Sequence, residues 1–251
     1  MALVRASALP TGPGQVTAQL EPSETRAARV REMFDRIAGR YDLLNRVLTF
    51  GMDVGWRRRA VRVLALPPGS LVLDLACGTG ALCRELVRAG HRPVGFDFSP
   101  GMLARAGTSA PLVQADVLRV PVGSGVADGV ACGFALRNVV DLPGLFREAA
   151  RVLRPGGRAV FLEVSEPEQP FLRLGHSVYF RRVVPVVGGL LSDREAYAYL
   201  PASMTYLPSS AELAEMLEGA GFGDVRRIAL AAGVAQVVAG TRIGGGERRR
   251  R

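Results

Sequence analysis

The chain has 251 residues, 48% of them hydrophobic, and a formal net charge of +9. This length and apolar content suit one globular domain with its own core, and no apolar run reaches the roughly 18 residues that would span a bilayer. Aromatic residues make up only 6% and are not interleaved with the basic ones, so the charge gives no basis for a nucleic-acid partner.

Residues 1–22 mix prolines and glycines with polar residues and hold no compact apolar segment, so we expect a disordered leader rather than a signal peptide. Residues 23–69 are expected to form an N-terminal helical cap that ends at Gly69. Four apolar residues of this cap recur at i, i+3, i+4 and i+7, the spacing of one helix face: Val30, Met33, Phe34 and Ile37.

Strands and helices are expected to alternate over residues 70–165. Short apolar runs predict strands at residues 71–75, 93–98, 112–116, 129–136 and 159–164. Helices are expected at residues 81–89, 100–106 and 142–153, and Pro155, Gly156 and Gly157 are expected to stop the last one. This alternation predicts a mostly parallel sheet that helices cover on both faces.

The pattern changes after the fifth strand. Residues 166–208 are rich in Tyr, Arg and Pro and are expected to form a helical lid over a substrate. Residues 209–243 predict a helix, with Ser209 or Ser210 as its N-cap, and two antiparallel strands that complete a seven-stranded sheet. Residues 244–251 are expected to be a disordered basic tail.

A glycine-rich turn, D-L-A-C-G-T-G, joins the first strand to the helix after it at residues 74–80. Gly78 and Gly80 would let the backbone approach a ligand where any Cβ would collide, and the helix N-terminus would point free N–H groups at the ligand. The turn lacks the third glycine of the G-x-G-x-x-G pattern that binds pyrophosphate. Its carboxylate, Asp74, would repel a pyrophosphate but suits the cationic amino group of a methionine moiety, directly or through water.

Two further carboxylates end the next two strands. Asp97 ends the second strand, where a carboxylate can accept hydrogen bonds from both hydroxyls of a ribose. Asp116 ends the third strand and, with the Val117 amide, is placed to meet the exocyclic amine of adenine. Since the carboxyl ends of parallel strands share one edge, these residues and Asp74 define one crevice and predict S-adenosylmethionine as the cofactor. In the alternative interpretation, Asp97 and Asp116 are N-caps and turn residues.

Longer segments resemble known families. D-L-A-C-G-T-G, G-F-D-F-S, Q-A-D-V and R-V-L-R-P-G-G-R, in this order over residues 70–165, resemble the Rossmann-like class I methyltransferases. A more specific resemblance covers residues 29–240. It is carried by M-F-D-R-I-A-G-R-Y-D-L-L-N at 33–45, by G-F-A-L-R-N-V at 133–139 and by E-A-Y-A-Y-L at 195–200. These segments resemble the ubiquinone/menaquinone-biosynthesis C-methyltransferases, the demethylmenaquinone methyltransferase-like enzymes.

The resemblance implies that Thr79, Asp97, Asp116 and Val117 bind S-adenosylmethionine. It also implies transfer of its methyl group to a ring carbon of a polyprenylated quinol, either demethylmenaquinol or a related benzoquinol. Gly133 stands where many relatives have a serine that contacts the cofactor. The predicted cofactor site comprises Asp74, Gly78, Thr79, Gly80, Asp97, Phe98, Asp116, Val117 and Gly133.

Carbon methylation needs an electron-rich ring, which a quinol provides when its hydroxyl ionises to a phenolate. Arg137 is the candidate whose positive charge lowers the phenol pKa and stabilises this phenolate. A guanidinium is a poor base, so a water is expected to relay the proton. Asn138 would orient a water or the ring oxygen, and Tyr41 and Asp42 would close over the site. The alternatives are a structural salt bridge from Arg137 to Asp141 and a packing role for Tyr41.

The expected partner is a small lipophilic quinol. An apolar stripe in residues 171–191 would hold its tail or serve packing, and His176 within it would act as a base or lie on the surface. Peripheral contact with the inner face of a membrane and a homodimer are left open. So are an N- or O-methyltransferase of a phospholipid or natural product and a nicotinamide oxidoreductase.

The three cysteines are Cys77, Cys83 and Cys132. An odd number without metal-ligand spacing argues against a disulfide framework and against a zinc site. We therefore expect no metal and a reducing, cytoplasmic location.

Overall fold

The computed structural model describes residues 23–167 and 206–244, together with seven residues between these ranges: Gln169, Phe171, Arg173, Gly175, Tyr179, Arg182 and Ser203. The predicted leader, nearly all of the predicted tail, His176 and most of the predicted lid lie outside the described residues. Within the described ranges no helix combines the length and hydropathy needed to cross a bilayer.

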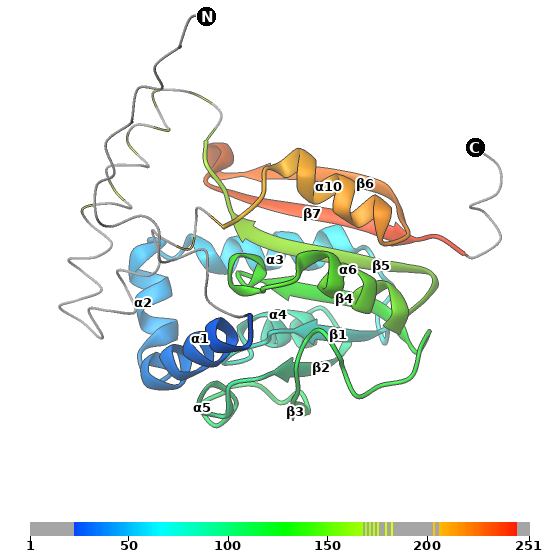
Figure 1. The fold of residues 1–251 in the computed structure, drawn as a ribbon, viewed down its shortest axis with the longest axis horizontal. Helices are drawn as coiled ribbons and strands as arrows, with labels where there is room; N and C mark the ends of the chain where they lie inside the picture. Colours follow the sequence, from blue (N-terminus) through cyan, green and yellow to red (C-terminus); the bar gives the residue numbers. More distant parts are fainter. Residues whose placement is uncertain are drawn as a thin grey trace, which may run out of the picture.

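A seven-stranded sheet in the order β3-β2-β1-β4-β5-β7-β6 forms the centre of the molecule (Figure 1). Its strands are β1 (Leu71–Leu75), β2 (Arg92–Asp97), β3 (Leu112–Gln114), β4 (Ala127–Gly133), β5 (Leu153–Val164), β6 (Phe222–Leu230) and β7 (Ala235–Arg242). The first five strands pair in parallel, and β7 is antiparallel to both β5 and β6. The predicted fold class, a mostly parallel sheet completed by antiparallel strands, is confirmed.

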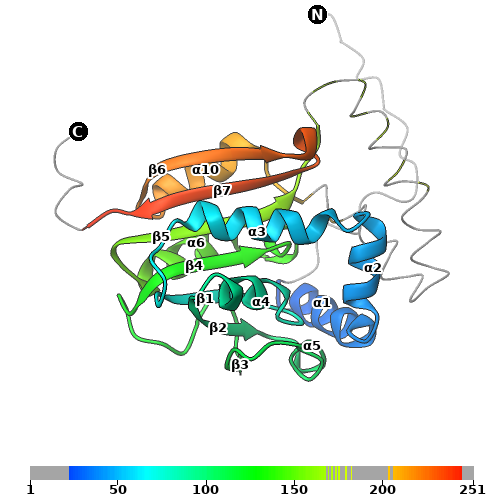
Figure 2. The ribbon, with the colours of Figure 1, turned by 180° about the vertical axis from the view of Figure 1, so that it is seen from behind.

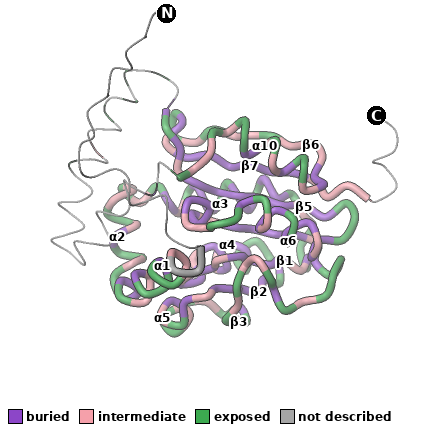
Figure 3. The backbone as a smooth tube through the Cα atoms, viewed as in Figure 1, coloured by how far each residue is buried: buried purple, intermediate pink, exposed green. Residues whose placement is uncertain are grey.

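Helices cover both faces of this sheet. Helices α6 (Leu142–Val152) and α10 (Ser210–Gly219) lie on the face seen in Figure 1, and α3 (Met52–Leu64) and α4 (Ala81–Arg88) lie on the face seen in Figure 2. In β5, Phe161 packs toward α6 and α10 while its neighbour Val160 packs toward α3 and α4. Both faces of the central strands are therefore buried (Figure 3), which explains why these strands are continuous apolar runs.

The segment predicted as one helical cap divides into two parts. Helices α1 (Ser23–Ile37) and α2 (Tyr41–Leu48) lie at one end of the sheet, where α1 packs on α5 (Pro100–Leu103) around Met33, Ile37 and Met102. Helix α3 belongs instead to the sheet, because its apolar side packs directly on β4, β5 and β7. Its Trp56 is buried, with its ring centroid 6.2 Å from that of Phe134.

Most predicted strand and helix ends differ from the observed ones by a few residues, two of them for a clear structural reason, and one ambiguity is resolved. β4 ends at Gly133 rather than at 136, because Phe134 takes a φ of +60° and residues Leu136–Asn138 form a short 3-10 helix, η1. The predicted stop after α6 lies inside β5, which starts directly at Leu153. Ser209 is the N-cap of α10, and its hydroxyl and the Glu212 carboxylate form a capping box.

Candidate active site

A cavity of about 720 Å³ lies where the parallel strands end. Its walls come from the segments after β1, β2, β3 and β4 on one side and from α1 and α2 on the other. The predicted site residues among its lining are Tyr41, Gly78, Asp97, Phe98, Asp116, Val117, Gly133 and Asn138. Four predicted residues are not among the described lining: Asp74, Thr79, Gly80 and Arg137.

The Asp97 carboxylate joins two of these segments. Its Oδ2 accepts a hydrogen bond from the Gly78 amide at 2.8 Å, and its Oδ1 accepts one from the Ser99 amide at 2.9 Å. Burial raises the pKa of Asp97, and the two amides oppose that rise. Each carboxylate oxygen can accept a second hydrogen bond, so the side chain can both hold the loops and bind a polar ligand in the cavity.

The two glycines of the turn have different tasks. A Cβ at Gly78 would meet no described atom within 4 Å, so this residue borders open space beside the cavity. A Cβ at Gly80 would lie 2.6 Å from Cγ2 of Thr108, and its φ is +74°. Gly80 is therefore required by packing beneath the turn, while Gly78 leaves room for a ligand.

Asp116 combines the two interpretations that the sequence left open. Its Oδ1 accepts a hydrogen bond from the Leu118 amide at 2.9 Å, which makes it a turn residue. The residue is also exposed and lines the cavity together with Val117. Its carboxylate can accept further hydrogen bonds beside the one that fixes the loop.

Asp74 lies beneath the turn rather than in the cavity wall. It is fully buried, and its Oδ2 accepts a hydrogen bond from the Cys83 thiol, with 3.1 Å between Oδ2 and Sγ. Its Oδ1 has no hydrogen-bond partner in the described part of the chain. Burial is the main cause that raises the pKa of Asp74 to about 7. The geometry therefore does not support a direct bond from Asp74 to a ligand in this cavity.

Arg137 forms a buried ion pair with Glu163, at the end of β5. The expected partner Asp141 is wrong: Asp141 caps α6 by accepting the Gly144 amide at 2.8 Å, and it pairs with Arg147. The sequence pattern did not reveal Glu163, because the pair depends on the parallel register of β4 and β5.

Asn138 follows Arg137 in η1 and faces the cavity. Its Oδ1 is buried and has no hydrogen-bond partner among the described residues. An acceptor oxygen buried in this way is costly unless a ligand or water donates to it. Opposite, Phe34 and Tyr41 stack edge to face at 5.9 Å and add an aromatic wall that the sequence indicated only for Tyr41.

The strand order, the antiparallel β7 and a cavity with carboxylates at the ends of β2 and β3 define a Rossmann-like class I methyltransferase. A solved structure shares this fold. A methyltransferase in complex with the Trm112 methyltransferase activator from Haloferax volcanii superposes with a TM-score of 0.63 at 20% identity, covering 84% of this chain and 98% of that one.

The chain belongs to the ubiE/COQ5 methyltransferase family, whose model matches residues 22–242. It is 40% identical over 233 residues to the demethylmenaquinone methyltransferase of Roseiflexus castenholzii, covering 90% of this chain and 98% of the relative. It is 41% identical over 221 residues to the ubiquinone/menaquinone biosynthesis C-methyltransferase UbiE of Syntrophotalea carbinolica, covering 84% and 93%. The family predicted from the signature segments is confirmed.

Asp74 should make the stability of the fold depend on pH. Burial raises its pKa from 3.8 to about 7, so its contribution to stability is complete below about pH 4 and is lost as the pH rises through about 7. The Asp74→Asn side chain cannot ionise but can still accept a hydrogen bond from the Cys83 thiol. Relative to wild type, we expect its free energy of unfolding to gain on the order of 2–4 kcal/mol between pH 4 and pH 8.

Urea unfolding at pH 4, 6 and 8 measures this gain. A difference between Asp74→Asn and wild type that stays the same at all three pH values would contradict an Asp74 carboxyl that is protonated in the folded protein.

Proposed function

We propose that this chain is an S-adenosylmethionine-dependent C-methyltransferase that methylates the ring of a polyprenylated quinol, demethylmenaquinol or a related benzoquinol. The observation that carries the proposal is one cavity with two unlike walls. Carboxylates at the ends of β2 and β3 line one side, and Val30, Phe34 and Tyr41 line the other. The polar wall suits a nucleoside and the apolar wall suits a lipophilic ring.

The cofactor fits the residues present. Asp97 would accept hydrogen bonds from the ribose, Asp116 and Val117 would bind the adenine, and Phe98 lines the same cavity. The open space at Gly78 would take the methionine part. The volume, about 720 Å³, is within the usual range for small-molecule sites. When bound, S-adenosylmethionine supplies an electrophilic methyl group on a sulfonium.

Tyr41, Asn138 and Arg137 would serve the methyl acceptor. A rotation of the Asn138 side chain would bring its buried, unpartnered Oδ1 to a quinol hydroxyl in the cavity and so orient the ring. Tyr41 would hold the ring against the apolar wall. Arg137 is buried next to Asn138 in η1 and does not line the cavity among the described residues, and Glu163 compensates its charge. For Arg137 to stabilise a phenolate, the quinol oxygen has to compete with Glu163 for the guanidinium.

The same proposal includes a cytoplasmic location and peripheral contact with the inner face of a membrane. Support for the contact comes from α2, where Leu43 and Val47 are exposed, and from Phe50, which is 77% exposed. Apolar side chains in this arrangement favour an interface with lipid. A homodimer stays a prediction.

Asp97 should be required for cofactor binding. Asp97→Ala removes the ribose acceptor and both loop hydrogen bonds, so we expect affinity for S-adenosylhomocysteine to fall at least about 100-fold in calorimetry. Asp128→Ala is the matched control, because Asp128 also accepts a backbone amide, that of Leu71, but it lies at the start of β4. Equal affinities of the two variants would show that the cofactor is not held at Asp97.

Methyl transfer to carbon is the direct test of the function. The purified chain is given S-adenosylmethionine and a chemically reduced, geranyl-substituted 1,4-naphthoquinone whose adjacent ring carbon carries hydrogen. We expect a product with one added methyl group in mass spectra and without the ring proton in NMR spectra. Methylation of the hydroxyl oxygen, or transfer to phosphoethanolamine but not to the quinol, would overturn the proposal.

The ion pair allows a test of Arg137 that separates catalysis from folding. Removing Arg137 alone would leave Glu163 buried without a partner, at a cost of about 3–5 kcal/mol. The double variant Arg137→Gln/Glu163→Gln keeps the site neutral. We expect it to bind S-adenosylhomocysteine as wild type does and to lose turnover about 100-fold.

Glu163→Gln alone is the control for the double variant. It removes the competitor for the guanidinium but leaves Arg137 buried without its partner, at a similar folding cost, so turnover is measured per mole of folded protein. Its rate profile should shift to lower pH with turnover retained. If the double variant turned over within about threefold of Glu163→Gln, Arg137 would have no part in the chemistry.

A further inference from the structure

Two carboxylates connect the N-terminal helices to the loops of the cofactor side. The first is Asp35 of α1. Its Oδ1 accepts hydrogen bonds from the Ser99 hydroxyl at 2.6 Å and from the Gly101 amide at 2.8 Å. A Cβ at Gly101 would lie 2.7 Å from the same oxygen, so the approach of α1 to this loop is close. Since Asp97 binds the Ser99 amide, Asp35 holds the loop that Asp97 also holds.

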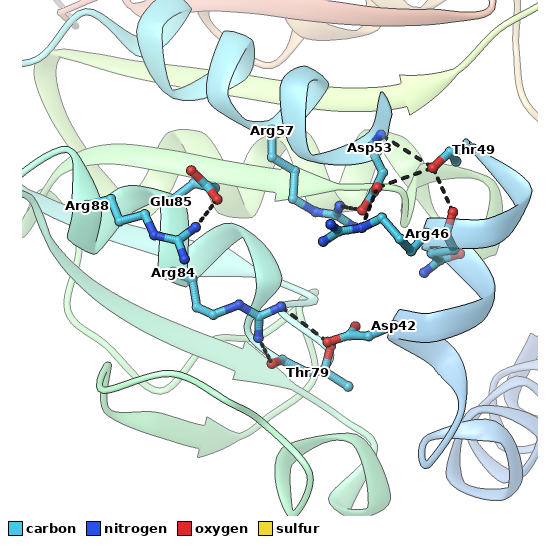
Figure 4. A network of polar contacts seen from close by, with 10 residues as sticks. Asp42, Arg46, Thr49, Asp53, Arg57, Thr79, Arg84, Glu85 and Arg88 are labelled. Atoms are coloured by element: carbon cyan, nitrogen blue, oxygen red, sulfur yellow. Dashed lines mark hydrogen bonds and ion pairs between the residues drawn. The ribbon is translucent and has the colours of Figure 1, made fainter. Parts of the chain in front are cut away.

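The second carboxylate is Asp42 of α2, shown in Figure 4. Its Oδ1 accepts a hydrogen bond from the Thr79 hydroxyl at 2.5 Å, and its Oδ2 pairs with Nη2 of Arg84 at 3.2 Å. Arg84 closes the triangle, because its Nη1 donates to the Thr79 carbonyl at 3.1 Å. Asp42 thus binds the Thr79 side chain directly and the Thr79 backbone through Arg84.

The other end of α2 is attached to α3. The Thr49 hydroxyl lies 3.2 Å from Oδ1 of Asp53, and Nε of Arg46 lies 3.3 Å from the same oxygen. Asp53 also forms a buried ion pair with Arg57 in α3. Because α3 is packed into the sheet, this end of α2 is the fixed one, and only the Asp42 end meets the turn.

The contact between Asp42 and the glycine-rich turn is of modest strength. The side chain of Asp42 is 46% exposed and that of Arg84 is 29% exposed, so their ion pair contributes little by itself. The Thr79 hydroxyl is buried, and its bond to Asp42 adds a short polar contact. A contact of this kind can break and re-form when a ligand enters or leaves the site at the turn.

We infer that Asp42, supported by Asp35, is a positioning residue that couples the cofactor turn to the acceptor wall. The inference rests on the proposed function. Tyr41 precedes Asp42 on α2 and lines the cavity, and Phe34 precedes Asp35 on α1 and lines it too. A ligand that orders the turn at 76–80 therefore fixes Tyr41 through Asp42. It fixes Phe34 through Asp35 and the loop that Asp97 joins to the turn. By linkage, a closed aromatic wall also favours the ordered turn.

Hydrogen exchange of the full chain, with and without saturating S-adenosylhomocysteine, tests this coupling without any methyl acceptor. In wild type the ligand should slow exchange of α2 amides about tenfold. In Asp42→Asn, which keeps one acceptor oxygen but loses the charge facing Arg84, we expect this slowing to disappear while the turn at 76–80 stays protected. Asp42→Glu should restore part of it.

Glu32→Gln is the matched control. It removes the same charge from α1, where Glu32 is exposed and lies 3.8 Å from Arg36, without touching the turn. Ligand-induced protection of α2 in Asp42→Asn equal to that in Glu32→Gln would overturn the coupling. If wild type failed to bind S-adenosylhomocysteine at all, the proposed function would fail instead, so the two failures are distinguishable.

A merely structural role is separated by a second measurement. Thermal unfolding of the ligand-free variants should give the same melting temperature for Asp42→Asn and Glu32→Gln, because the Asp42 ion pair is half exposed. Affinity for S-adenosylhomocysteine should fall about tenfold in Asp42→Asn only. A loss of melting temperature in Asp42→Asn with unchanged affinity would also overturn the coupling.

Discussion

A single carboxylate at the end of β2 holds together the two loops on which the cavity is built. Asp97 accepts one amide from the turn after β1 and one from the loop after its own strand. The backbone pairing of the sheet ends with the strands, so these two hydrogen bonds set the spacing between the loops beyond them. Everything that faces the cavity from this side, from Gly78 to Phe98, takes its position from that arrangement.

Several carboxylates near this arrangement are buried, and their desolvation costs free energy. Asp74 is buried beside Cys83 and its pKa is raised to about 7, whereas Glu163 and Asp53 are each paired with an arginine. Buried ion pairs of this kind contribute little net stability, because desolvation offsets the attraction. Their concentration near one end of the sheet indicates that this end is organised for recognition, while the apolar layers behind it supply the stability.

Local patterns predicted most of the fold. The first strand was predicted at its observed bounds, and the N-cap of α10 was one of two candidates, because apolar period and capping chemistry are properties of neighbouring residues. The failures concern contacts between distant segments. Arg137 meets Glu163 through strand register, α3 joins the sheet rather than the cap, and Asp42 meets Thr79 across 37 residues of chain. The spacing of residues within one segment does not reveal which distant segment it contacts, so none of these pairings could be predicted locally.

Trp56 is the only tryptophan of the chain, and α3 holds it against Phe134. Phe134 in turn borders the cavity from a strained backbone position, where its φ is +60°. The protein therefore carries a natural optical probe one aromatic ring away from its ligands. We expect the emission of this indole to respond when a ligand repacks Phe134, so binding could be followed in the unmodified protein without a label.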